Sequence, residues 1–223
     1  MIILLEGVDG SGKTTYVNKL KEKLILLGKN VDIISGLLPE YKNKITREMD
    51  SLEISKIAIS SFKDVLIRIN LNKENNVITI LDRFLPSMFA YQIYKENLFK
   101  PYIGFIKNYE SEEVLSEYQR LNKFFFNSFY VNIIYLDVDD NTIKNRLEIK
   151  TRDVLDDYFL ENMNKIKSGY SIYFNDLKTY IKKENLSCIN VHDDFNNELL
   201  LSMDDYISNL MKHYSVKYVT LEE

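Results

Sequence analysis

The chain is predicted to be an α/β protein whose parallel sheet is covered by helices on both faces. Two observations support this fold class. Short apolar or β-branched runs alternate with longer stretches of helical periodicity, which is typical of α/β folds. The short runs are apolar almost throughout, as in strands that are buried on both faces. The five expected strands are Ile2–Leu5, Val31–Ser35, Val77–Leu81, Val131–Val138 and Ser187–Val191.

Helix signals lie between these strands. The stretch Thr14–Leu27 carries apolar residues on one face, and Gly28 follows at the position where a glycine commonly ends a helix. The next helix, Leu52–Lys73, follows Asp50 and Glu53, which have the spacing of a capping box. Further helices are expected over Ser87–Asn97, Glu112–Asn127, Thr142–Ile149, Asp156–Lys183 and Asn197–His213.

Length and composition indicate one globular domain over residues 1–223, and they exclude several classes of protein. The net charge of −4 provides no overall basic field for nucleic acid. A lone cysteine, Cys188, excludes an intrachain disulfide and favours a reducing compartment. The apolar run before Glu6 is too short for a signal sequence, and no apolar run is long enough to span a membrane. We therefore expect a cytoplasmic protein without a membrane partner.

The first strand runs into a phosphate-binding motif. The segment fits G-x-x-x-x-G-K-[ST], with a strand before it and an amphipathic helix after it. Glycines allow the backbone N–H groups to turn inward, and the helix N-terminus adds partial positive charge. A plain glycine turn is the alternative. The predicted ATP-binding residues here are Gly7, Val8, Asp9, Gly10, Ser11, Gly12, Lys13, Thr14 and Thr15. Lys13 can bridge phosphate oxygens, and Thr14 can bind Mg²⁺.

Two charged residues, Asp82 and Arg83, follow the third strand directly. Ligands of parallel sheets bind beyond the carboxyl ends of the strands, so both charges are expected at the mouth of the sheet. Asp82 is predicted to hold Mg²⁺, usually through water, beside Thr14. Arg83 can bind a second phosphate, that of the acceptor. The alternatives are a helix cap for Asp82 and a simple surface ion pair.

The segments LLEGVDGSGKTT and DRFLPSMFAYQ together resemble the thymidylate kinase family. The later stretch YLDVDDNTIKNRLEIKTRDVLDDYFLENMNKIKSGY is also similar to a strand of that family with its L-D-V turn, the Arg-bearing helix and the lid. The resemblance extends from Ile2 to about Met211. It implies a three-layer P-loop kinase fold with a five-stranded parallel sheet and a small lid at about residues 146–160. It also implies ATP as phosphoryl donor, Mg²⁺ as cofactor and a homodimer.

The resemblance further implies roles for the acceptor site. Asp9 would contact the 3′-hydroxyl of the sugar, and Tyr91 would pack against the deoxyribose. Gln92 would hydrogen-bond the edge of the base, and Phe62 would stack on it. Aromatic residues at helical spacing are commonly core, so that interpretation of Tyr91 and Phe62 stays open. The implied acceptor site comprises Asp9, Phe62, Arg68, Arg83, Ser87, Tyr91 and Gln92.

On the donor side, family members with a small residue at the position of Gly10 usually supply a positive charge from the lid. Arg152, or Lys150, would then close over the transferred phosphoryl group, unless this basic run is simply solvated. Arg146 would lie near the adenine. The implied catalytic residues are Lys13, Asp82, Arg83 and Arg152.

The chain departs from the family pattern at two places, both on the acceptor side. The arginine that clamps the acceptor phosphate is missing after the second strand, where the nearest bases are Lys42, Lys44 and Arg47. The arginine expected four residues after Phe62 is replaced by Leu66, and Arg68 is the closest substitute.

The predicted reaction is ATP-dependent phosphorylation of a deoxynucleoside monophosphate, foremost dTMP to dTDP. One alternative is a deoxynucleoside kinase or a kinase for another, possibly modified, pyrimidine monophosphate. An alternative of another class is a nucleotide-binding switch without acceptor turnover.

Overall fold

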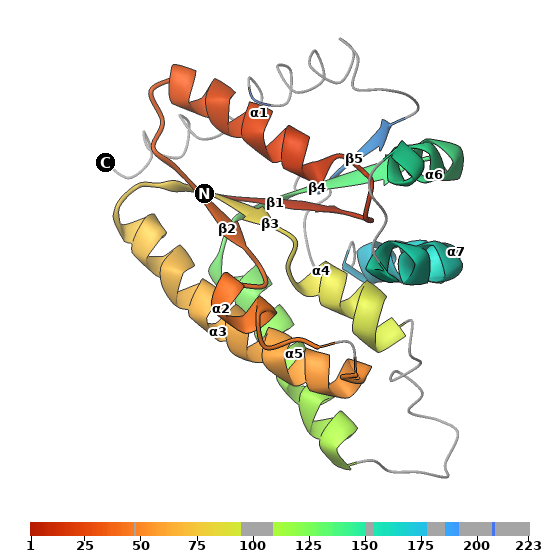
Figure 1. Ribbon diagram of the computed structural model, residues 1–223. Coiled ribbons are helices and arrows are strands. Elements are labelled where there is room, and N and C mark those ends of the chain that lie inside the picture. Colours follow the sequence, from red (N-terminus) through yellow and green to blue (C-terminus); the bar gives the residue numbers. More distant parts are fainter. Residues whose placement is uncertain (47, 95–108, 150–153, 178–185, 192–206, 208–223) are drawn as a thin grey trace.

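The structure is a computed structural model that describes residues 1–46, 48–94, 109–149, 154–177, 186–191 and 207 (Figure 1). Five parallel strands form one sheet in the order β2-β3-β1-β4-β5. This result confirms the predicted α/β fold with a five-stranded parallel sheet. The strands are β1 (Ile2–Gly7), β2 (Val31–Ser35), β3 (Ile78–Asp82), β4 (Val131–Val138) and β5 (Leu186–Val191).

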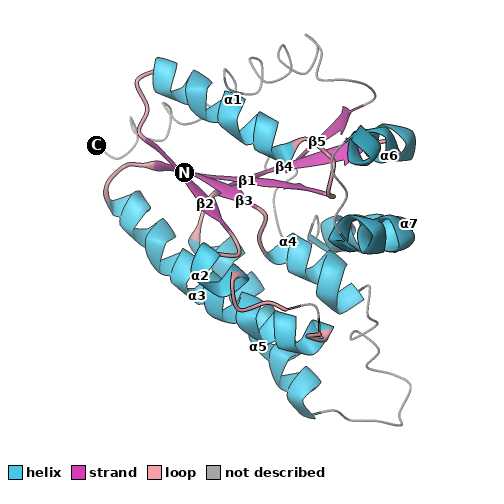
Figure 2. Cartoon of the chain, viewed as in Figure 1, coloured by secondary structure: helices cyan, strands magenta, loops and turns pink. Residues whose placement is uncertain are grey.

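Helices cover both faces of the sheet (Figures 1 and 2). Helix α1 (Lys13–Leu26) lies on one face, while α3 (Ser51–Glu74) and α5 (Tyr109–Ser128) lie side by side on the other. Helices α6 (Asp140–Ile149) and α7 (Val154–Leu177) follow β4. None of the helices in the described part of the chain is long and apolar enough to cross a membrane.

The core forms where the sequence is continuously apolar. Ile3, Leu4 and Leu5 of β1 are fully buried, as are Ile133 and Ile134 of β4, so these strands are covered on both faces. The capping box before α3 is also present. The Asp50 side chain accepts hydrogen bonds from the amides of Leu52 and Glu53, and Glu53 accepts one from the Asp50 amide.

One predicted helix has a different form. In place of a single α-helix from Ser87, the chain forms a short helix α4 (Leu85–Met88) and then a π-helix η1 (Phe89–Tyr94). Helix α7 packs on η1, and a Cβ atom built on Gly169 would lie only 2.9 Å from Ala90 Cα. This tertiary contact is not visible in local periodicity.

Other helix predictions differ in smaller ways. The short helix α2 (Pro39–Lys42) was not expected, although Pro39 at its first position is a common start. The expected end of α7 and most of Asn197–His213 lie outside the described residues.

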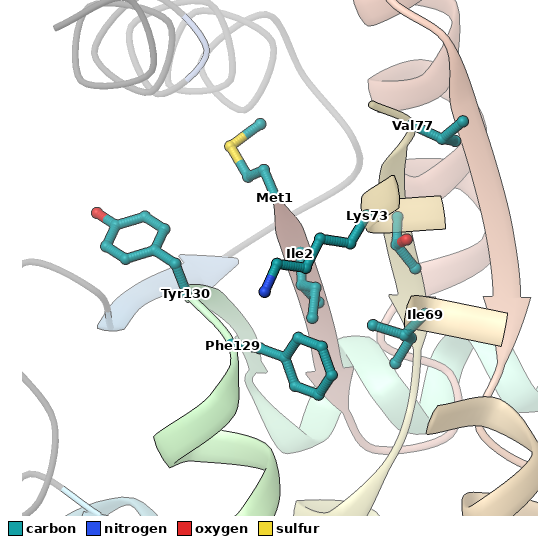
Figure 3. A pocket seen from close by; sticks show the side chains of 8 residues that line it. Met1, Ile2, Ile69, Lys73, Val77, Phe129 and Tyr130 are labelled. Carbon is teal, nitrogen blue, oxygen red and sulfur yellow. The ribbon is translucent and has the colours of Figure 1, made fainter. Parts of the chain in front are cut away.

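The register of the sheet aligns the loops that carry the predicted motifs. Leu5 pairs with Asp82, and Ser35 pairs with the same Asp82, so the loops after β1, β2 and β3 leave one edge together. A cavity of about 100 Å³ lies instead at the opposite edge, where β1, β3 and β4 begin (Figure 3). Its lining includes Met1, Ile69, Lys73, Phe129 and Tyr130.

Candidate active site

The loop between β1 and α1 is built on left-handed glycines. Gly10 has φ 76° and Gly12 has φ 87°, values that residues with a Cβ atom rarely adopt. Gly12 is also the N-cap of α1, so no side chain caps the first turn of this helix, and that turn contains no acidic residue. The amides and the partial positive charge of the helix end therefore remain available for an anion.

Lys13 lies within this loop and is only 8 % exposed. Its Nζ donates hydrogen bonds to the Val8 carbonyl at 2.7 Å and to Ser11 Oγ at 3.3 Å. Burial lowers the pKa of Lys13 to about 7, with the nearby Arg83 adding to the effect. An entering phosphate group would add negative charge beside Lys13 and so favour its charged form.

Asp82 ends β3 beside the loop. Its Oδ1 is buried and has no hydrogen-bond partner among the residues that the structure describes. Thr14 is exposed in the first turn of α1. An unsatisfied carboxylate oxygen and a free-standing hydroxyl suit Mg²⁺, which prefers oxygen ligands and keeps several waters. The described residues contain no cluster of three metal-binding side chains, so a metal here would need phosphate and water ligands.

Arg83, Asp9 and Tyr91 form one cluster across the edge of the sheet. Arg83 Nη2 lies 2.6 Å from Asp9 Oδ1, and the Tyr91 hydroxyl donates to Asp9 Oδ2 at 3.0 Å. The Arg83 guanidinium also lies over the Tyr91 ring, 5.2 Å from its centroid. The side chain of Asp9 is 47 % exposed and that of Arg83 is 26 % exposed, so both are accessible to a ligand.

The backbone of Arg83 is held in an uncommon conformation. Its φ of 62° is left-handed, which is costly for a residue with a long side chain. The Arg83 amide donates to the Leu5 carbonyl, and the Gly36 amide donates to the Asp82 carbonyl. A Cβ atom at Gly36 would lie 2.2 Å from the Arg83 carbonyl oxygen, so only glycine fits beside this turn. Such strain, fixed by its surroundings, is common at functional sites.

The structure also reveals a buried group that the sequence interpretation missed. Glu6, inside β1, is fully buried, and its carboxylate accepts hydrogen bonds from the Phe84 amide, Ser87 Oγ and the Tyr170 hydroxyl. Burial raises the pKa of Glu6. The sequence did contain a sign of this group, because a carboxylate within an otherwise apolar strand needs hydrogen-bond partners.

Two other predicted acceptor residues lie away from this cluster, and a third lies next to Tyr91. Phe62 is 4 % exposed and packs on Phe84 with 4.5 Å between ring centroids, which is the core position left open above. Arg68 forms a two-point ion pair with Asp32, near the start of β2 and away from the cluster. Gln92 is half-buried in η1 beside Tyr91.

The remaining predicted bases are distributed as follows. Arg146 of α6 donates to the Gly10 carbonyl at 3.2 Å, so it contacts the phosphate-binding loop. Lys42 and Lys44 are exposed at α2. Lys150, Arg152 and Arg47 lie outside the described residues.

Comparison with known proteins gives consistent relatives. The chain is 30 % identical over 185 residues to a thymidylate kinase of Acholeplasma laidlawii, an alignment that covers 76 % of this chain and 83 % of that protein. It is 37 % identical over 95 residues to a probable thymidylate kinase of Sulfolobus acidocaldarius, covering 41 % of this chain and 49 % of that one. No protein-family profile matches the chain.

A solved structure is similar over nearly the whole fold. The thymidylate kinase of Ehrlichia chaffeensis aligns with a TM-score of 0.59 and 22 % identity, covering 95 % of this chain and 98 % of that one. At this identity the likeness concerns the fold.

Proposed function

The chain belongs to the thymidylate kinase family, and from that premise we propose that it phosphorylates dTMP to dTDP with ATP as donor. It is accordingly a nucleoside monophosphate kinase. The observation that supports this proposal most directly is the contact between the donor loop and the acceptor side. Asp9 of the phosphate-binding loop is joined to Arg83 and Tyr91, which extend from the loop after β3 and from η1.

The proposed donor site is the loop Gly7–Thr15 with the N-terminus of α1. The loop amides and Lys13 would bind the phosphates of ATP, and Arg146 would lie towards its adenine. Thr14 and Asp82 would hold Mg²⁺, which would neutralise negative charge on the phosphates. Arg152 would act as the lid arginine and close over the transferred phosphoryl group. The donor and acceptor sites would belong to a single domain.

The proposed acceptor site faces this loop. Arg83 would bind the phosphate of dTMP with its planar guanidinium, which suits two-point contact with an oxyanion. Asp9 and Tyr91 would contact the sugar, and Gln92 the base. An oxygen of the dTMP phosphate then forms a bond to the γ-phosphorus while the bond to the β–γ bridging oxygen breaks and ADP leaves. Positioning and charge supply most of the catalysis in such a transfer.

Steady-state kinetics tests this proposal. ADP formation is measured with ATP and, in turn, dTMP, dUMP, dCMP, dGMP, dAMP and thymidine. We expect dTMP to give the highest kcat/KM. A result in which no monophosphate accelerates ADP formation would exclude the proposal, and turnover of thymidine but not dTMP would indicate a nucleoside kinase.

The variant Arg83→Ala tests whether Arg83 binds the acceptor phosphate. We expect kcat/KM for dTMP to fall about 100-fold, since a charged contact to the reacting phosphate is lost, while ATP binding is retained. Arg120→Ala is the matched control, because Arg120 is exposed on α5 and, among the described residues, forms its ion pair with Glu117 of the same helix. Equal losses for the two variants would contradict the assignment.

We further propose a cytoplasmic homodimer that uses the outer surface of α3 and α5. Ile67 and Leu71 of α3 and Phe124 of α5 are large apolar side chains exposed on these adjacent helices. Burying them in a second copy would remove their apolar surface from water. Sedimentation analysis should give a dimer for the native chain and a monomer for the double variant Ile67→Glu, Leu71→Glu.

A further inference from the structure

We propose that Glu6 is a positioning residue for Arg83, acting through the hydroxyl of Ser87 and through the backbone turn at Phe84. This inference deepens the proposed function and depends on it, because Arg83 matters only if an acceptor phosphate binds there. It assigns a role to a buried charge that the phosphate-binding motif and the acceptor cluster leave unused.

A chain of hydrogen bonds connects Glu6 to Arg83 through Ser87. Arg83 Nη1 donates to Ser87 Oγ at 3.4 Å, and Ser87 Oγ donates to Glu6 Oε2 at 2.6 Å. The Tyr170 hydroxyl lies 2.7 Å from Ser87 Oγ and donates to the same Glu6 oxygen at 3.1 Å. A carboxylate can only accept, so it turns the Ser87 proton towards itself and leaves the Ser87 lone pairs for Arg83.

A second connection runs through the backbone. Glu6 Oε1 accepts from the Phe84 amide at 2.7 Å, directly after the left-handed Arg83. Phe84 itself is 1 % exposed and packs between Phe62 and Phe125. One carboxylate thus holds both the turn that carries Arg83 and the hydroxyl that the Arg83 guanidinium contacts.

The burial of Glu6 also excludes a role as general base for the acceptor. With no exposed surface and donors from three residues, the carboxylate faces no space where a substrate could bind. It is therefore not placed to remove a proton from an acceptor hydroxyl, the step that a nucleoside kinase would require. Its effect on catalysis has to pass through the groups that it holds.

Glu6→Gln tests this arrangement with little change of shape. The amide oxygen can still accept from Phe84, but the NH₂ group then faces Ser87 and Tyr170 as a donor, which reverses the direction of the hydrogen bond to Ser87. We expect kcat/KM for dTMP to fall about tenfold, as for the loss of one hydrogen bond to a charged group. The dissociation constant for ATP should change less than about twofold, because the donor loop keeps its contacts.

A double-mutant cycle separates positioning from a general structural defect. If Glu6 acts through Arg83, Glu6→Gln in the Arg83→Ala background should lower kcat/KM for dTMP by less than about twofold further. The same tenfold loss in both backgrounds, or an equal loss of ATP affinity, would overturn the proposal. Failure of the native enzyme to turn over dTMP would instead refute the proposed function, so the two failures are distinguishable.

A second variant covers the case in which Glu6→Gln does not fold. Tyr170→Phe removes one donor to Glu6 while keeping the ring that packs on Tyr135 and Phe174. We expect a loss of about threefold in kcat/KM for dTMP, smaller than for Glu6→Gln because Glu6 keeps its hydrogen bonds from Phe84 and Ser87. No further loss is expected in the Arg83→Ala background. A loss that persists in that background would count against the proposal.

Discussion

Among single residues, Lys13 has an acid–base chemistry that burial changes strongly. Its ammonium group is buried and donates a hydrogen bond to the Val8 carbonyl, and burial lowers its pKa to about 7. Below that pH the side chain is charged, and above it the neutral form prevails in the free protein. Bound phosphate favours the charged form, so binding above pH 7 must be accompanied by proton uptake.

This residue gives a prediction for ATP binding. Between pH 7 and the pKa that Lys13 reaches in the complex, the dissociation constant for ATP should rise by up to about tenfold per pH unit. Isothermal titration at pH 8 in two buffers of different ionisation enthalpy should register uptake of a proton. Lys13→Met, which cannot titrate, serves as control, and identical heats in the two buffers for the native chain would contradict the prediction.

Some residues of the candidate site could be predicted from the sequence, and others could not. Lys13, Asp82 and Arg83 could be found because strand ends and a glycine-rich motif place them. Glu6 could have been found as a charge in an apolar strand, but its partners Ser87 and Tyr170 are distant in sequence. Arg68 was chosen by its distance from Phe62 along one helix, and its real partner, Asp32, lies on another element.

At the level of elements, the π-helix η1 depends on a close approach by α7. The prediction is that Gly169→Ala destabilises the fold, because its Cβ would lie 2.9 Å from Ala90 Cα and 3.1 Å from Tyr94 Cδ1. Overpacking against backbone costs about 1–3 kcal/mol, which exceeds the roughly 1 kcal/mol that alanine gains over glycine in a helix. Urea unfolding measures the difference.

The neighbouring residue provides the control for this variant. Ser168 is exposed on α7 and bonds only its own helix at the Asn164 carbonyl, so Ser168→Ala should change the free energy of unfolding by less than about 0.5 kcal/mol. We also expect Gly169→Ala to raise KM for dTMP, since η1 carries Tyr91 and Gln92. An unchanged stability would show that η1 can shift freely.

The N-terminus of α3 offers a prediction that concerns stability alone. Asp50→Ala removes two hydrogen bonds of 2.8 Å to the first turn, so the free energy of unfolding should fall by about 0.5–2 kcal/mol. Asp50→Asn should lose little, because asparagine also caps helices well. The kcat of both variants should match that of the native chain, and a large loss of activity would link this cap to the site.

Element types and the strands were predictable because apolar runs and caps are local signals. The π-helical turn was not, since the spacing of apolar residues cannot separate i+4 from i+5 hydrogen bonds over six residues. The π-helix also packs closely against Gly169, a residue far from Ala90 in sequence, and local patterns do not register such a contact.

For the whole molecule, the candidate active site and the cavity lie at opposite ends of the sheet. The candidate active site lies at the carboxyl ends of the strands, whereas the cavity beside Phe129 lies at the amino ends (Figure 3). Ile69→Ala should enlarge that cavity, and for a side chain 1 % exposed the expected loss of stability is about 2–5 kcal/mol. Below the unfolding transition, kcat and both KM values should remain native. A kinetic defect in the folded variant would mean that the two edges are coupled.

The pairing of Leu5 with Asp82 has a consequence for how such an enzyme can change over time. The donor loop and Arg83, the proposed acceptor arginine, extend from adjacent, hydrogen-bonded strands, so the pairing of β1 with β3 sets their spacing. The long crossover between Ser35 and Ile78 supports the turn at Arg83 through Gly36 and Phe62. That crossover contains α2 and α3, where Leu66 stands four residues after Phe62. Under the proposed function, substitutions in α2 and α3 away from Gly36 and Phe62 can therefore accumulate while the donor loop and Arg83 keep their spacing.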